Sequence, residues 1–138
     1  PSASRRLLTR TQELGVGTQC MFAVRAALSQ PAKLVEQVGE AIERGVIDPA
    51  SIDDPADPLA FVTDPASAEP GRPAPGTLME AGYRFCAHEP GIDVVLSGTS
   101  SPAHLEENVA SIGMPALPKT TLERLRSIFG PVDCLSGN

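Results

Sequence analysis

The stretch that decides the fold is IDVVLSGTSSP, which runs from Ile92 to Pro102. Ile92–Leu96 is a short, mostly apolar run that predicts a buried strand. Ser97–Ser101 is small and rich in hydroxyl groups, as is typical of a loop. Ser101-Pro102 provides an N-cap followed by a proline in the first helical turn. The sequence therefore predicts a strand, a tight loop and a helix in immediate succession.

Alternating strands and helices are expected on either side of this stretch. An earlier apolar run, Val16–Val24, predicts a second strand. Apolar spacing, capping boxes that begin at Thr77 and Thr120, and flanking Gly and Pro predict helices over residues 4–14, 31–44, 77–88, 102–112 and 120–129. We expect an α/β fold with a parallel sheet and right-handed crossovers, because strands that alternate with helices pair in that way. Two strands leave both sheet edges open, which indicates a piece of something larger.

Residues 46–76 differ from the rest of the chain because Asp-Pro pairs recur throughout them. A loop of this length is usually a lid or an insertion. Leu59, Phe61 and Val62 form an apolar patch within it, which we expect to fix the loop to the body of the domain. On the last but one helix, we expect Leu105, Val109 and Ile112 to form the buried stripe.

Composition limits the possible functions. The chain has 138 residues, of which 41% are hydrophobic and 4% aromatic, which is typical of a folded domain with an aliphatic core. The net charge of −6 disfavours binding to nucleic acid and to anionic membranes. No apolar run reaches the length of a membrane helix, so we expect no membrane partner.

The cysteines indicate neither a disulfide framework nor a metal site. Cys20, Cys86 and Cys134 are far apart and odd in number. Cys86 and His88 are poorly spaced for two ligands on a helix, and no further ligand is obvious, so we expect no metal. Together with the lack of a secretory signal, this pattern predicts a cytoplasmic protein with reduced thiols.

The chemistry of the chain is expected at the loop that follows Leu96. Backbone N–H groups at the start of the next helix are free to bind anions, phosphate above all. Gly98 lets the backbone approach a ligand closely, and the neighbouring hydroxyl groups add donors. The alternative, a turn with no ligand, stays open. Ser-Pro is common at the start of helices, and Gly98 can be required by the turn alone.

Two segments, Tyr83–Asn108 and Val16–Ser29, closely resemble the end of the aldo-keto reductase family, and the terminal helix fits as well. The resemblance implies that residues 1–138 are a C-terminal fragment of a (β/α)8 TIM barrel, with the Pro/Asp-rich segment at 46–76 as a loop. It further implies an oxidoreductase that uses NAD or NADP to act on aldehydes, ketones or alcohols.

The resemblance also implies a set of cofactor-binding residues. Phe22 matches the aromatic residue that stacks on the nicotinamide, and Arg25 could neutralise the pyrophosphate. Gly98, Thr99 and Ser100 would line the adenosine phosphate region, while Glu107 and Asn108 match the pair near the adenosine. NADP-binding members often carry cations where this chain has Gly98 and His104, so NAD or dual use is expected.

No catalytic residue is assigned, because the family's catalytic Asp, Tyr, Lys and His have no counterparts here. Tyr83 is expected on an outer helix and is not taken as the general acid. The chain alone is then expected to be inactive, and to pair with a missing N-terminal half or with itself. Two other hypotheses stay open: a non-catalytic module that binds phosphate or nucleotides, and a structural subunit that completes a barrel. The carbonyl or alcohol substrate is not identified.

Overall fold

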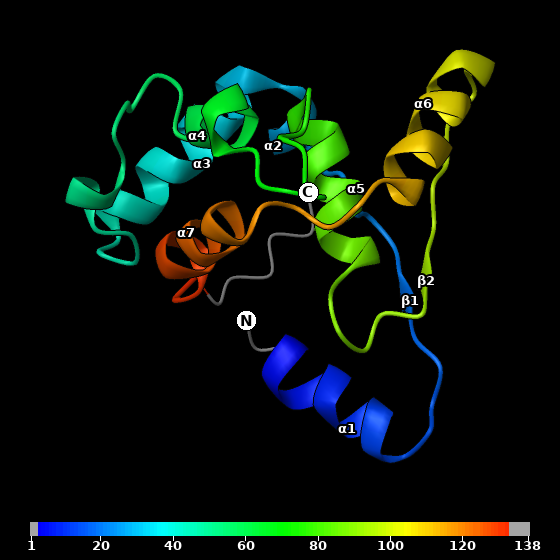
Figure 1. Cartoon of the computed structure of the whole chain (residues 1–138). Coiled ribbons are helices and arrows are strands. Elements are labelled where there is room, and N and C mark those ends of the chain that lie inside the picture. The colour runs from blue at the N-terminus through cyan, green and yellow to red at the C-terminus, as the bar shows by residue number, and fades with distance from the viewer. Residues whose placement is uncertain (1–2, 133–138) are drawn as a thin grey trace.

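The computed structural model describes residues 3–132 and is mostly helical (Figure 1). The elements follow one another in the order η1 (Ala3–Leu8), α1 (Thr9–Glu13), β1 (Gln19–Cys20), α2 (Ala26–Ser29), α3 (Pro31–Glu43), η2 (Pro49–Ser51), α4 (Ala60–Thr63), η3 (Pro65–Ser67), α5 (Leu78–Ala87), β2 (Val94–Val95), α6 (Pro102–Gly113) and α7 (Lys119–Phe129).

The core lies among α3, α4, α5, α7 and the loop at 46–76 (Figure 1). We call these elements, together with α2, the helical body. α3 buries Leu34 and Val38, which are four residues apart and so share one helical face. Its first turn carries Pro31, which is favourable there because the N–H of this position has no helical partner. The described core residues are Leu34, Val38, Ile47, Ile52, Leu59, Val62, Ala81, Leu117 and Ile128.

The Pro/Asp-rich segment at 46–76 is ordered by its own side chains. Asp48 Oδ1 accepts from the Ala50 N–H at 2.9 Å, and Asp64 Oδ1 accepts from the Ala66 N–H at 2.9 Å. Each aspartate therefore caps a short 3₁₀ turn that begins with proline. Leu59 and Val62 are buried, as predicted, and Phe61 is half-buried with the Arg124 guanidinium 4.2 Å from its ring centroid.

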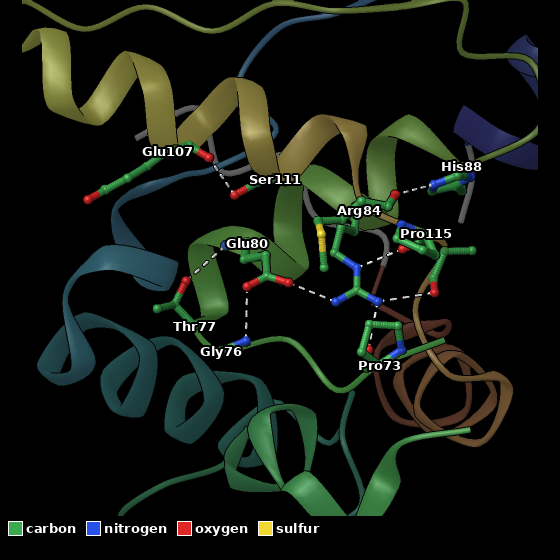
Figure 2. Close-up of polar contacts among 11 residues, drawn as sticks. Pro73, Gly76, Thr77, Glu80, Arg84, His88, Glu107, Ser111 and Pro115 are labelled. Atoms are coloured by element: carbon green, nitrogen blue, oxygen red, sulfur yellow. Dashed lines mark hydrogen bonds and ion pairs between the residues drawn. The ribbon is translucent and has the colours of Figure 1, made fainter. Parts of the chain in front are cut away.

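Arg84 fastens two loops to α5 (Figure 2). Its side chain is fully buried. Nη1 donates to Glu80 Oε1 at 2.8 Å, Nε to the Pro115 carbonyl at 2.8 Å and Nη2 to the Pro73 carbonyl at 2.7 Å. Nη2 also lies 3.2 Å from the Ala116 carbonyl. A buried charge is tolerated when it is paired and hydrogen-bonded in this way.

The two predicted capping boxes have different outcomes. At α5, Thr77 Oγ1 accepts from the Glu80 N–H at 3.1 Å, as predicted, while Glu80 Oε2 accepts from the Gly76 N–H at 2.9 Å. At α7 the prediction is wrong: the helix begins at Lys119, and no side chain at its N-cap accepts a hydrogen bond. Glu69 from the long loop takes that role, accepting from the Lys119 and Thr120 N–H groups at 3.0 and 3.1 Å.

β1 and β2 pair in parallel, with Gln19 opposite Val94 and Cys20 opposite Val95. The Asp93 carboxylate fixes this register, since its Oδ2 accepts from the Thr18 N–H at 2.7 Å. We call β1, β2 and their flanking residues 14–22 and 92–101 the sheet arm. In Figure 1 it runs as a thin ribbon beside the helical body, with α6 at one end and α1 at the other.

The expectation of a C-terminal (β/α)8 barrel fragment is wrong. Within residues 3–132 the sheet has only two strands of two residues each, although longer strands were predicted at Val16–Val24 and Ile92–Leu96. The physical reason lies in the packing: the helices bury their apolar faces against one another and the long loop, and no strand residue belongs to the described core. A barrel needs strands that pair on both edges and helices that cover them.

The predicted stripe on α6 is also largely wrong. Leu105 and Val109 are 47% and 60% exposed, and only Ile112 is half-buried. Asn108 and Ser111 on the same helix are half-buried, so α6 approaches α5 with a face that is partly polar.

Candidate cofactor site

The parallel pairing brings the ends of two segments together. The Leu96 N–H donates to the carbonyl of Cys20, the last paired residue of β1, at 2.9 Å, and Leu96 directly follows the last paired residue of β2. Parallel strands end at the same edge of a sheet. Met21–Arg25 and Ser97–Ser101 therefore both follow their strands at the same end of the sheet, so the predicted nicotinamide-binding and phosphate-binding segments lie on the same side.

The loop Ser97–Ser101 leads into α6 with its backbone turned by local hydrogen bonds. Ser101 Oγ accepts from the His104 N–H at 3.4 Å, which makes Ser101 the N-cap, as predicted. Thr99 Oγ1 accepts from the Ser101 N–H at 3.1 Å. Gly98, Thr99 and Ser100 are exposed, and a Cβ atom on Gly98 would meet nothing within 4 Å. Neither a neighbour nor a positive φ requires glycine at residue 98, so the space in front of this turn is open to a ligand.

Phe22 has an unusual backbone for an exposed aromatic residue. Its φ is +63°, the only positive φ of a non-glycine residue among residues 3–132, and it is 65% exposed. The Arg25 guanidinium lies 5.5 Å from the centroid of its ring, within cation–π range. Non-glycine residues held at positive φ carry backbone strain, and such strain occurs preferentially at functional sites. The ring and the cation thus form an exposed pair beside the sheet edge.

Asn108 and Tyr83 meet at Ser97. Asn108 Nδ2 donates to Ser97 Oγ at 2.9 Å, and the Tyr83 hydroxyl lies 3.1 Å from the same oxygen. Tyr83 is buried on α5, so this contact connects the loop to the helical body. Asn108 was predicted to approach the adenosine, and in the structure one of its amide donors holds the loop. Ser97 and Tyr83 were not predicted as site residues, because no spacing in the sequence indicates a contact between α5, α6 and the loop.

His104 and Glu107 lie on α6 with exposed side chains. The Glu107 carbonyl accepts from Ser111 Oγ at 2.8 Å, a bond within the helix that leaves the carboxylate to solvent (Figure 2). The segment Gly98–Asn108 has no Lys or Arg, and Glu106 is a second exposed carboxylate. The potential near α6 therefore disfavours an additional phosphate group.

The described thiols are free and not arranged for metal binding. Cys20 and Cys86 form no disulfide, and burial, followed by the nearby Cys20, raises the pKa of the Cys86 thiol to about 12. Cys86 is therefore a neutral thiol at physiological pH. Between residues 3 and 132 no three His, Cys, Asp or Glu side chains gather as a metal site would require. Cys134 lies outside the described residues.

In the part of the chain that the structure describes, no helix has the length and apolarity needed to span a membrane. Comparisons with protein-family models, with curated proteins and with solved structures found no match for this chain.

Proposed function

We propose that this chain binds a nicotinamide dinucleotide and forms the cofactor-binding portion of an oxidoreductase of the aldo-keto reductase type, which acts on aldehydes, ketones or alcohols. The proposal rests on the resemblance of Tyr83–Asn108 and Val16–Ser29 to that family. The observation that carries it is the parallel pairing of β1 with β2, because this pairing brings the Phe22–Arg25 pair and the loop before α6 to one sheet edge.

Each part of the cofactor has a physically suited partner in this arrangement. In the first turn of α6, Pro102 has no N–H and the His104 N–H donates to Ser101 Oγ, so the turn offers the Ala103 N–H, which together with the hydroxyls of Thr99 and Ser100 suits a pyrophosphate. Arg25 adds a positive charge, and the exposed face of Phe22 suits a flat nicotinamide ring. His104 and Glu107 would lie toward the adenosine. The cofactor is NAD, or both NAD and NADP, because no Lys or Arg of Gly98–Asn108 is present to bind a 2′-phosphate.

The groups that carry out acid–base chemistry are assigned to residues outside Pro1–Asn138 or to another chain. Tyr83 is buried against Ser97 and is not available as a general acid. The chain alone therefore binds cofactor without turnover. The sheet arm exposes Val94 and Leu96 at 44% and 41%, and within residues 3–132 its strands have no further strand on their outer edges. Such edges associate with other strands, so we propose that the chain pairs with itself through this arm.

The test is titration of the purified chain with NADH and NADPH, following the fluorescence of the reduced nicotinamide, together with calorimetric titration of ADP-ribose. We expect Arg25→Gln to weaken NADH binding about tenfold, the effect of a lost charge-assisted hydrogen bond. Arg44→Gln, at the far end of α3, is the matched control and should leave the affinity unchanged. Phe22→Leu should weaken NADH but not ADP-ribose, which has no nicotinamide.

Three outcomes would contradict this function or the cofactor proposed for it. NADH that does not bind excludes a cofactor site. An NADPH preference above about tenfold would show that a cation outside α6 binds the 2′-phosphate. Equal, Phe22-independent binding of NADH, ADP-ribose and inorganic phosphate would favour the alternative, a non-catalytic module that binds phosphate groups through the turn before α6.

A further inference from the structure

A second candidate site lies inside the helical body, away from the loop before α6. A cavity of about 600 Å³ opens between α3, α4, α5 and α7. That volume lies within the range of roughly 300–1,000 Å³ for small-molecule sites, whereas protein interiors otherwise contain few voids larger than a water molecule. Its wall is formed mainly by aliphatic and aromatic side chains, among them Leu34, Val62, Phe85 and Phe129. An apolar wall holds water poorly, so an apolar ligand is the better occupant.

Among the described residues of the wall, the charged groups lie together in one place. Arg126 Nη2 donates to Glu89 Oε2 at 2.9 Å, and both residues line the cavity. The Glu89 side chain is 11% exposed and that of Arg126 is 55% exposed, so the carboxylate lies deeper than the guanidinium. Cys86, also in the wall, is neutral and adds no charge.

The Glu89–Arg126 pair determines which polar group of a ligand the cavity can accept. An anionic head would meet the Glu89 carboxylate, and a cationic head would meet the Arg126 guanidinium. A hydroxyl group can do what neither ion can, since it donates to a carboxylate and accepts from a guanidinium at the same time. A hydrocarbon would gain the apolar contacts and neither hydrogen bond.

We propose that the cavity between α5 and α7 is a binding site for a small, neutral, apolar alcohol or phenol, whose hydroxyl group forms hydrogen bonds at the Glu89–Arg126 ion pair. The apolar part of the ligand contacts the side chains of α3, α4, α5 and α7. Ala23, next to Phe22, belongs to the cavity wall, but the proposed binding of an alcohol does not depend on the proposed cofactor binding.

The experiment is calorimetric titration of the whole chain with 1-naphthol, naphthalene and 1-naphthoate, three probes of similar size. We expect 1-naphthol to bind about tenfold more tightly than naphthalene, which makes no hydrogen bond, and than 1-naphthoate, whose charge is repelled by Glu89. Glu89→Gln removes that repulsion and should reduce the preference for 1-naphthol over 1-naphthoate. Glu123→Gln, the same change at an exposed position on α7, should preserve the preference.

Ala81→Leu places a larger side chain in the wall and should abolish 1-naphthol binding, with circular dichroism showing that the helices remain. If this variant does not fold, Glu89→Gln and Glu123→Gln decide the matter alone. No saturable binding of 1-naphthol to the native chain overturns the proposal. It is equally overturned if folded Ala81→Leu binds 1-naphthol as the native chain does, or if Glu89→Gln and Glu123→Gln leave the same preference.

Discussion

The helical body buries aliphatic side chains of the same kind that the sheet arm leaves exposed. Val62 and Leu117 in the body are each 1% exposed, whereas Val94 and Leu96 in the arm are 44% and 41% exposed. The arm nevertheless has an apolar run of its own, Val94–Leu96. The difference teaches that apolar side chains stabilise the fold only where other elements cover them and remove their surface from water. In the body five helices and an ordered loop bury one another's apolar side chains, whereas the two short strands of the arm leave theirs exposed.

Arg84→Met should produce the largest effect, because it removes the connection between α5 and two loops of the body. Glu80 and the carbonyls of Pro73, Pro115 and Ala116 would lose their donor. We expect a loss of about 3–5 kcal/mol in the free energy of unfolding, the usual result of breaking a buried ion pair. Urea denaturation followed by circular dichroism measures it.

Arg124→Met is the control for that loss. Arg124 is paired with Asp53 at 2.6 Å on the surface and stacks on Phe61. Because water and salt screen an exposed pair, this variant should cost at most about 2 kcal/mol, stacking included. Equal losses for the two variants would contradict the central position given to Arg84.

The same substitution in the two regions tests the comparison directly. Leu117→Ala removes a side chain that is 1% exposed, and we expect it to cost about 2–5 kcal/mol. Leu96→Ala removes one that is 41% exposed and should cost less than about 1 kcal/mol, since little apolar surface is lost from burial. The measurement is again urea denaturation. A large loss at Leu96 would show that the arm is covered in solution.

Self-association of the chain would cover Leu96 and the rest of the sheet arm. We expect sedimentation equilibrium of the chain to show a dimer that dissociates on dilution. Leu96→Lys should raise its dissociation constant about tenfold, because edge lysines oppose strand pairing. Leu7→Lys, at another exposed leucine outside the sheet arm, should have no such effect. A native chain that stays monomeric at every concentration would rule out pairing through the arm.

Glu69→Gln should produce the smallest effect, one that appears in the pH dependence of stability. Hydrogen bonds from Lys119 and Thr120 lower the pKa of the Glu69 carboxyl below its ordinary value of 4.5. A lowered pKa in the folded state stabilises the fold fully above that ordinary value, and the stabilisation disappears as the pH falls through the lowered pKa.

The melting temperature of Glu69→Gln should therefore fall less between pH 6 and pH 3, roughly the span that brackets an ordinary glutamate, than that of the native chain. Glu123→Gln, at the residue that the sequence wrongly indicated as part of the cap of α7, is the matched control. An identical pH profile for all three proteins would mean that Glu69 does not cap this helix.

The sequence by itself determined the local structure of this protein. Pro31 and Ser101-Pro102 begin their helices as predicted, and Thr77 caps α5. The order in which the two strands precede their helices and the turn after Leu96 were predicted as well. These features depend on neighbours a few residues apart, since capping bonds, proline φ angles and helical periodicity are local.

Only the tertiary structure decided which apolar residues are buried and what meets at the candidate site. The apolar run Ile92–Leu96 suited a buried barrel strand. In the structure Val94 and Leu96 are exposed, because burial needs other elements packed against the run. Glu69 caps a helix 50 residues away, and Ser97 joins Tyr83 to Asn108. Such contacts depend on how helices pack and how the chain closes its loops, and the spacing of residues along the sequence carries no signal of either.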